Sequence, residues 1–276
     1  MAQLVEHHLA KVRVAGSNPV VRSRLVAMRR RFLACFALII GVALGSSCAN
    51  ESSPDAVIAA ASDTREAFGA IAEQVESSNG YEIEFVFGSS GLLREQLLNG
   101  APYDLYVSAN TAYVDEIVNA GVGVANSRAQ YALGRLAVIV AEGATLPERL
   151  EDVASFDRVV IANPQHAPYG VAAREALTSA GVLPSLEARL ILADNVADAV
   201  RLVESGEVSA GIVALSLVMD REHLVVAPES HEPIRQSYVV TVRGRDNAAI
   251  AKFLEVLNSP FGRDVLERYG FASVSS

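Results

Sequence analysis

Four short turns in the sequence place hydroxyl groups and unpaired backbone N–H groups where helices are expected to begin. The first carries Ser62, directly after the apolar run 56–61. The second is Gly88-Ser89-Ser90-Gly91, whose glycines allow a close backbone approach while consecutive N–H groups form a concavity that suits an anion. Taken alone, Ser62 is better explained as an ordinary helix N-cap. Together the two turns indicate a site built from hydrogen-bond donors.

The third and fourth turns offer backbone N–H groups at helix N-termini. Pro168 suits the first position of a helix, so Tyr169 is expected to present a free N–H group at the positive end of the helix dipole. Asn195 or Asp194 caps another helix and leaves the N–H group of Val196 available. Four such turns in one chain predict a binding site for a small anion.

The serine-containing turn at 88–91 does not match the best-known phosphate and hydrolase motifs. Leu92 and Leu93 follow it, where a phosphate-binding loop would have a lysine. Its spacing is G-S-S-G, whereas the nucleophile elbow of hydrolases has the spacing G-x-S-x-G. The motif therefore assigns no reaction by itself.

A serine hydrolase that uses Ser89 or Ser90 is an alternative, and it requires a general base. The chain after the N-terminal segment offers only His166, His223 and His231. None of the three has a recognisable triad context, and His166 is expected to be exposed in its loop. We therefore expect no catalytic residue and no enzymatic activity.

The elements that must position these turns alternate along the chain. Strands are expected at 56–61, 82–87, 105–107, 136–140, 159–162, 190–192, 211–214, 224–226 and 238–242, with helices after most of them. Phe68, Ile71 and Val75, for example, fall at i, i+3 and i+7 after the first run. This alternation predicts an α/β fold with mainly parallel sheets. In such sheets ligands bind beyond the carboxyl ends of the strands, where the four turns lie.

The composition is that of a folded chain with an acidic balance. Of the 276 residues, 51% are hydrophobic, which is ample for a packed core. The 23 basic and 32 acidic residues give a formal net charge of −9, which argues against a nucleic-acid partner. Only two cysteines are present, which argues against a disulfide framework or a zinc cluster.

The N-terminal segment has the pattern of an export signal. Three arginines at 29–31 precede the uncharged apolar run 32–44, which is followed by Gly45-Ser46-Ser47-Cys48. As a helix this run spans only about 20 Å, which is too short for a transmembrane helix. We expect residues 28–48 to be a signal peptide with a lipobox-like end, Cys48 to be the lipid attachment site, and residues 1–27 to be a misassigned start.

Removal of this segment would change the net charge of the mature chain, which begins at Cys48. Seven of the 23 basic residues and one of the 32 acidic residues precede Cys48, which leaves 16 basic and 31 acidic residues and a formal net charge of −15. The sequence therefore predicts an acidic exported domain, in the periplasm or on the cell surface as a lipoprotein. The export signal also argues against an intracellular effector-sensing domain.

An ordered set of segments resembles the bacterial molybdate-binding proteins of ABC importers. It spans about 56 to 271 and comprises Ala59-Ala60-Ala61-Ser62, Phe87-Gly88-Ser89-Ser90-Gly91, Gly100-Ala101-Pro102-Tyr103-Asp104, Ala167-Pro168-Tyr169-Gly170, Asn195-Val196, Gly211-Ile212-Val213 and Glu267-Arg268-Tyr269-Gly270-Phe271. The resemblance implies a two-lobed periplasmic-binding-protein fold with two crossover strands and a ligand cleft between the lobes. One lobe would comprise 49–133 plus 236–276, and the other 134–235.

The resemblance also implies the site and the partners. The oxyanion, molybdate or tungstate, would accept bonds from Ser62, Ser90 and the N–H groups of Tyr169 and Val196. The neighbouring Ser89 and Asp63 are further candidates. No residue would be a direct ligand of molybdenum, and no cofactor is implied. The protein would be a monomer that delivers its ligand to an ABC transporter permease.

Two positions depart from a simple anion site. Many family members carry a ligand-binding tyrosine after Gly-Ile-Val, and here that residue is Ala214. Asp63 is an acid beside the expected anion, and we expect its side chain to face away and cap the helix. Ala214 indicates a variant donor set rather than a different fold.

Neutral donors are sufficient to hold an anion on an acidic protein. Each hydrogen bond to an ionised acceptor contributes about 1.5–3 kcal/mol, and nanomolar affinity corresponds to about 12 kcal/mol net. A site with donors only also disfavours a protonated oxyanion, because the hydroxyl of that ligand would face a protein N–H or O–H group and neither could accept a hydrogen bond. This favours molybdate or tungstate over hydrogen phosphate. A receptor for sulfate or another small anion with the same fold remains the alternative.

Overall fold

The computed structural model describes residues 53–274, so the expected signal segment and Cys48 lie outside the described residues. The described chain contains two five-stranded sheets. The first has the strand order β2-β1-β3-β10-β4. Its strands are β1 (Ala56–Ala61), β2 (Ile83–Gly88), β3 (Leu105–Ser108), β4 (Ala129–Gly134) and β10 (Ile234–Val240).

The second sheet has the strand order β7-β6-β8-β5-β9. Its strands are β5 (Leu136–Val140), β6 (Val159–Ala162), β7 (Leu190–Ala193), β8 (Ala210–Ala214) and β9 (Leu224–Val225). The chain passes from the first sheet to the second between β4 and β5, and it returns before β10. The two sheets are the cores of two lobes, which confirms the expected two-lobed fold with two crossovers.

Each sheet is mixed, whereas the sequence pattern suggested mainly parallel sheets. In the first sheet β1 is parallel to β2 and β3, but β10 is antiparallel to β3 and β4. In the second sheet β6 is parallel to β7 and β8, but β5 is antiparallel to β8 and β9. The antiparallel pairs involve β5 and β10, the strands with which the chain enters the second lobe and returns to the first. Alternation of strands and helices predicts parallel pairing and gives no information about these two strands.

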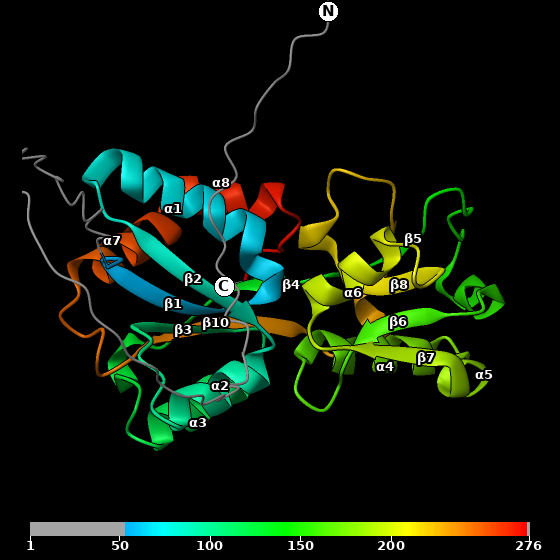
Figure 1. Ribbon diagram of the computed structural model, residues 1–276, viewed down its shortest axis with the longest axis horizontal. Helices are drawn as coiled ribbons and strands as arrows, with labels where there is room; N and C mark the ends of the chain where they lie inside the picture. The colour runs from blue at the N-terminus through cyan, green and yellow to red at the C-terminus, as the bar shows by residue number, and fades with distance from the viewer. Residues whose placement is uncertain (1–52, 275–276) are drawn as a thin grey trace, which may run out of the picture. The chain divides into compact units, whose positions relative to one another are not determined.

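Helices cover both faces of each sheet (Figure 1). In the first lobe α1, α7 and α8 lie on one face and α2 and α3 on the other; in the second lobe α6 and α4 lie on opposite faces. The α-helices are α1 (Arg65–Asn79), α2 (Ser90–Leu98), α3 (Thr111–Asn119), α4 (Pro168–Ser179), α5 (Leu183–Leu186), α6 (Val196–Glu204), α7 (Ala248–Leu257) and α8 (Pro260–Arg268). Short 3-10 helices are η1 (Ser62–Thr64), η2 (Ala125–Ser127), η3 (Leu150–Ser155), η4 (Glu187–Arg189), η5 (Leu215–Leu217) and η6 (Pro228–Ser230).

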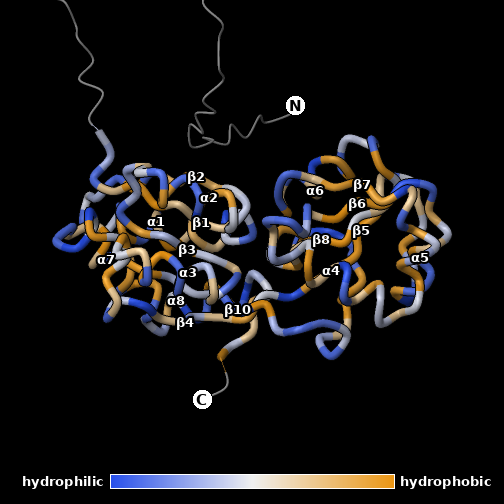
Figure 2. The backbone as a smooth tube through the Cα atoms, turned by 90° about the horizontal axis from the view of Figure 1, so that it is seen from below, coloured by the Kyte–Doolittle hydropathy of each residue, from blue (hydrophilic) through white to orange (hydrophobic). Residues whose placement is uncertain are grey.

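The cores form where the apolar periodicity predicted them. Phe68, Ile71 and Val75 on α1 are fully buried, and the Phe68 ring packs edge-on against Phe253 of α7 with 5.2 Å between ring centroids. In the second lobe most residues of β5, β6 and β8 are buried. Figure 2 shows hydrophobic residues gathered along the interior of the lobes and hydrophilic residues at the surface turns.

Two segments of the first sheet differ from the sequence expectation. β4 was not expected, because its residues are mostly half-buried and lack a clear alternation. β10 begins at Ile234, four residues earlier than the expected strand at 238, because its first half contains Arg235, Gln236 and Ser237. These polar residues are unusual in a central strand, and Gln236 is nevertheless fully buried.

Within the described residues, no helix has the length and apolar character that crossing a membrane requires.

Candidate functional site

The four turns identified in the sequence meet at one small cavity. Each turn contributes to its lining: the β1–η1 turn, the β2–α2 turn, the N-terminus of α4 and the N-terminus of α6. The lining residues are Ala61, Ser62, Asp63, Gly88, Ser89, Ser90, Ala109, Ala167, Pro168, Tyr169 and Val196. The first two turns belong to one lobe and the last two belong to the other, so the cavity lies between the lobes.

Ser62 and Ser90 are buried here with their hydroxyl hydrogens available. The Ser62 Oγ atom accepts a long hydrogen bond of 3.4 Å from the N–H group of Ala197, and the Ser90 Oγ atom accepts one of 3.1 Å from Ala109. Both side chains are at most 2% exposed. Because backbone N–H groups occupy acceptor positions on both oxygens, each hydroxyl can donate its own hydrogen to a bound acceptor.

The N-terminus of α6 supplies a backbone donor. The Asn195 side chain caps this helix by accepting from the N–H groups of Ala197 and Asp198 at 3.0 and 3.1 Å. Val196, the first residue of α6, lies one position before these two and lines the cavity. Among residues 53–274 no hydrogen-bond partner engages the Val196 N–H group, so it is free to bind an anion.

The N-terminus of α4 is held close to β6 by a glycine. A Cβ atom at Gly170 would lie 2.0 Å from the carbonyl oxygen of Ala162, the last residue of β6. Only glycine permits this approach, which fixes the start of α4 and with it Tyr169, one of the residues that line the cavity. Pro168 occupies the first helical position, as expected.

Asp63 does not cap a helix facing away from the cavity, so that expectation is wrong. Asp63 is 1% exposed and is among the residues that line the cavity. The Oδ2 atom accepts hydrogen bonds from the Tyr169 hydroxyl at 2.9 Å and from the Gln236 Nε2 atom at 2.6 Å. Ser216 of η5 donates to the Asp63 backbone carbonyl at 2.7 Å. The contacts with Tyr169 and Ser216 join the two lobes, so Asp63 is drawn inward by partners that are distant in sequence.

The surroundings of Asp63 favour its neutral form. Burial raises the pKa of its carboxyl to about 7, although the hydrogen bonds from Tyr169 and Gln236 lower it. The Tyr169 hydroxyl has a pKa well above its ordinary value, because it is buried and lies beside Asp63. Tyr169 therefore stays protonated and remains a donor to the carboxyl group across the neutral range.

His166 is half-buried and bonded to the opposite lobe, which corrects the expectation of an exposed loop histidine. Its carbonyl oxygen accepts from the Ser89 hydroxyl at 2.5 Å and from the Gly91 N–H group at 2.9 Å. The Nδ1 atom lies 2.8 Å from the Ser89 Oγ atom. Because the single hydroxyl hydrogen of Ser89 is directed at the carbonyl, Nδ1 carries a hydrogen and donates to Oγ. The Ser89 hydroxyl is thus engaged between the lobes.

The cavity is small and its lining contains no lysine or arginine. The space open to the centre of a water-sized sphere is about 10 Å³, comparable to a single water position. A solute as large as a sugar or an amino acid does not fit, and a tetrahedral oxyanion fits only if the lobes part slightly around it. Within residues 53–274, no cluster of three or more His, Cys, Asp or Glu side chains could hold a metal ion.

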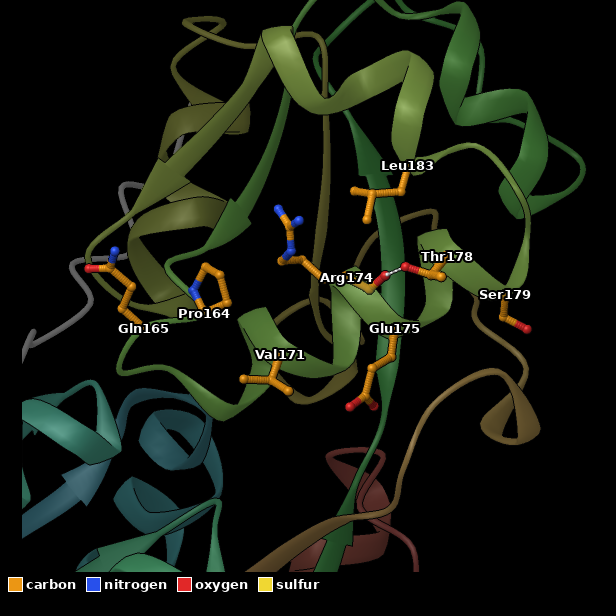
Figure 3. Close-up of a pocket in the computed structure, with 8 residues that line it drawn as sticks. All are labelled: Pro164, Gln165, Val171, Arg174, Glu175, Thr178, Ser179 and Leu183. Carbon is orange, nitrogen blue, oxygen red and sulfur yellow. Dashed lines mark hydrogen bonds between the residues drawn. The ribbon is translucent and has the colours of Figure 1, made fainter.

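A larger pocket, of about 700 Å³, lies on the surface of the second lobe beside α4 (Figure 3). Figure 3 shows Arg174 and Glu175 extending from α4 and Leu183 from α5. Arg174 is already paired with Glu187, with an N–O distance of 3.0 Å. This pocket is broad and open, and most of its lining lies outside the four turns. It is not suited to enclose a small anion.

Sequence reasoning missed the polar residues that surround Asp63. Gln236 lies in a strand whose polar start looked like a loop, and Tyr131 lies in the unexpected strand β4, where its hydroxyl donates to the Gln236 Oε1 atom at 3.2 Å. Ala214 is fully buried at the end of β8 and offers no side-chain donor. Gln236 is fully buried in an internal strand of the sheet. The run of polar residues around it was the one sequence feature that could have indicated a buried polar cluster here.

Comparison with known proteins defines the class of this chain. The sequence model of the family described as bacterial extracellular solute-binding protein matches residues 56–272. The chain belongs to this family.

Individual relatives carry more specific names. The molybdate-binding protein ModA of Escherichia coli (strain K12) is 33% identical over 88% of this chain and 99% of its own length. The protein of the same name from Azotobacter vinelandii is 32% identical over 83% of this chain and 95% of its own length. The solved periplasmic molybdate-binding protein of Azotobacter vinelandii superposes with a TM-score of 0.75 at 27% identity, covering 80% of this chain and all of that one.

Proposed function

We propose that this protein is an extracytoplasmic receptor that captures a tetrahedral oxyanion, molybdate or tungstate, and delivers it to an ABC importer. The observation that carries the proposal is the convergence of four donor turns from two lobes on one cavity. Relatives at 32 and 33% identity that are named molybdate-binding proteins support molybdate as the ligand. The ligand is transported cargo, and no cofactor takes part.

The proposed site consists of two hydroxyl donors and two backbone donors. Ser62 and Ser90 donate from the first lobe, and the N–H groups of Tyr169 and Val196 donate from the second. Ser89 contributes indirectly, because its hydroxyl is bonded to His166. Molybdenum is held through its oxygen atoms, without a protein atom bound to the metal. We also propose that the lobe boundaries lie near residues 134 and 235, so that β1 to β4 and β10 belong to one lobe and β5 to β9 to the other.

The donor set accounts for selection among anions. A fully ionised oxyanion accepts a hydrogen bond from every donor, whereas hydrogen phosphate brings a hydroxyl that faces the donors of Ser62, Ser90, Tyr169 and Val196 unfavourably. Sulfate matches molybdate in charge and shape, so size separates the two. Binding of sulfate or another small anion with the same fold is the alternative function.

The geometry does not favour a hydrolase. Ser89 and His166 are within hydrogen-bond distance, but the Ser89 hydroxyl also bonds to the His166 carbonyl oxygen, and no carboxylate that would orient the ring as a general base bonds to His166 among the described residues. We propose that the protein is not an enzyme. Purified protein should show no turnover of generic esters, and turnover that disappears in His166→Ala would support a hydrolase instead.

We further propose that the protein is exported and works as a monomer with a membrane permease. The sequence pattern at 28–48 supports export, and Cys48 is the proposed lipid attachment site. Mass spectrometry of the mature N-terminus tests both points. A diacylated N-terminal Cys48 is expected, and an unmodified chain that begins upstream of residue 28 would contradict export through this signal.

Calorimetric titration of ligand-free protein tests the function. Molybdate and tungstate should bind with one site per chain and nanomolar affinity, and sulfate should bind at least a hundredfold more weakly. Tight sulfate binding with no heat from molybdate would overturn the proposal in favour of the sulfate alternative. Bicarbonate-free Tris buffer avoids competing oxyanions.

A further inference from the structure

Asp63 is the only acidic residue that lines the cavity, and its two carboxyl oxygens have different surroundings. The Oδ2 atom accepts from both Tyr169 and Gln236, which uses its two acceptor positions. The Oδ1 atom is buried and has no hydrogen-bond partner in the described part of the chain. One oxygen is therefore saturated as an acceptor, while the other has no donor facing it.

This asymmetry matches a neutral carboxylic acid. In a carboxylic acid one oxygen is a carbonyl-type acceptor and the other carries a hydrogen that can be donated. An ionised carboxylate would instead leave a buried charge with an unpaired oxygen and would repel a dianion in the same cavity. The other lining residues carry no charged side chain, so a hydrogen on Oδ1 would add one more donor to those of Ser62, Ser90, Tyr169 and Val196.

We propose that Asp63 takes part in oxyanion binding as a carboxylic acid, with the hydrogen on Oδ1 donated to the ligand, so that capture of the dianion takes up a proton at and above neutral pH. This inference rests on the proposed function and adds a specificity residue to it. The raised pKa of about 7 supports it, because the proton is then gained or lost in the physiological range.

Other charged groups near Asp63 are engaged elsewhere or are neutral. The elements that pack most closely against η1 include α1, α6 and η5, and the side-chain partners of Asp63 come from α4 and β10. On α1, the Arg65 guanidinium lies over the Phe87 ring at 4.7 Å, and Glu66 is exposed. On α6, Asp198 is paired with Arg201 at 2.9 Å. Residues 215–217 of η5 contain no ionisable side chain.

Two phenols complete the titratable surroundings. Burial raises the pKa of both Tyr169 and Tyr131 well above the ordinary value, so both remain neutral when Asp63 titrates. No lysine or arginine forms an ion pair with Asp63 among the described residues. His166 also adjoins the cavity through its contact with Ser89, so the Asp63→Asn variant is needed to isolate the contribution of Asp63 to the pH dependence of binding.

Calorimetric titration with molybdate at several pH values, in Tris and in imidazole buffers, tests this inference. These buffers contain no oxyanion, and their different ionisation enthalpies report the number of protons taken up. For the wild-type protein, the Kd should rise by about tenfold for each pH unit above about 7, with close to one proton taken up per molybdate.

Asp63→Asn is the decisive variant, because an amide keeps the acceptor toward Tyr169 and Gln236 and presents a permanent donor in place of Oδ1. Its Kd should stay constant between about pH 7 and 9, with no proton uptake. Asp63→Ala lacks both the donor and the titrating group, so its Kd should be at least tenfold higher than that of Asp63→Asn and should also stay constant between about pH 7 and 9. A flat wild-type profile, or an Asp63→Asn profile that keeps the wild-type slope, would overturn the inference.

Failure of the inference is distinguishable from failure of the proposed function. Tight, pH-independent molybdate binding by the wild-type protein contradicts only the role of Asp63. Absence of molybdate binding at every pH contradicts the receptor function itself. Circular dichroism of each variant before titration shows that the chain is folded.

Discussion

At the scale of single residues, the direction of each serine's hydroxyl hydrogen decides whether that serine can donate to a bound anion. Ser62, Ser89 and Ser90 all line the cavity, but only Ser62 and Ser90 accept from backbone N–H groups and keep their own hydrogen. The hydroxyl of Ser89 is directed at the His166 carbonyl oxygen. Three neighbouring serines therefore have two different roles, a difference that sequence pattern alone does not reveal.

Replacement of either donor serine should weaken oxyanion binding and leave the fold intact. Ser62→Ala and Ser90→Ala each remove one hydrogen bond to an ionised acceptor, which corresponds to about 1.5–3 kcal/mol, or roughly a ten- to hundredfold increase in Kd. Ser77→Ala, at an exposed position on α1, is the matched control and should bind as the wild type does. Unchanged affinity in both cavity variants would show that the ligand binds elsewhere.

Residue-level reasoning selected four donor candidates that line one cavity, and its expectation for the Asp63 side chain was wrong. Ser62, Ser90, Tyr169 and Val196 lie in turns that local sequence marks as helix starts, and the family resemblance implies their role as ligand donors. The partners of Asp63 lie 106 and 173 residues away along the chain. Such contacts depend on how the two lobes meet, and no local pattern encodes them.

At the scale of elements, the site depends on helices that begin at the ends of strands. α4 and α6 follow β6 and β7 of the same sheet, and both present N-terminal N–H groups at one sheet edge. Strand-helix alternation predicted most of these elements and their order. It missed β4 and the first half of β10, because half-buried and polar strands lack the apolar run by which strands are recognised.

Gly170→Ala should disturb the α4 N-terminus. The new Cβ atom would lie 2.0 Å from the Ala162 carbonyl oxygen, so the helix must move away from β6 and carry the Tyr169 N–H group with it. We expect an affinity loss of at least tenfold and a lower free energy of unfolding.

Gly69→Ala is the matched control, because no atom lies within 4 Å of its added Cβ position on α1. This change should raise the free energy of unfolding by about 0.5–1 kcal/mol and leave the Kd unchanged. Denaturant titration and calorimetry measure the two quantities. Equal behaviour of the two alanine variants would contradict the packing role given to Gly170.

At the scale of the whole molecule, the lobes meet through a few polar contacts around the cavity. Asp63 bonds to Tyr169 and Ser216, and Ser89 and Gly91 bond to His166. The order of motifs along the chain predicted the two-lobed architecture. It did not predict these contacts, because they join turns that belong to separate cores.

A ligand that binds between the lobes should stabilise the whole protein. At a free concentration one hundred times its Kd, a ligand adds about 2.7 kcal/mol to the free energy of unfolding. For a chain of this size, that corresponds to an increase in Tm of roughly 5–10 °C. Differential scanning fluorimetry with molybdate and with an equal concentration of sulfate measures the effect. An equal or larger shift with sulfate would favour the sulfate alternative.

The location of the bound ion can be observed directly by anomalous X-ray scattering at the molybdenum absorption edge, from crystals grown with molybdate. One strong anomalous peak should lie in the cavity between the lobes. The Oγ atoms of Ser62 and Ser90 and the backbone nitrogens of Tyr169 and Val196 should all lie within hydrogen-bond distance of the oxygens around it. A peak at any other position, or no peak in the cavity at saturating molybdate, would contradict the proposed site.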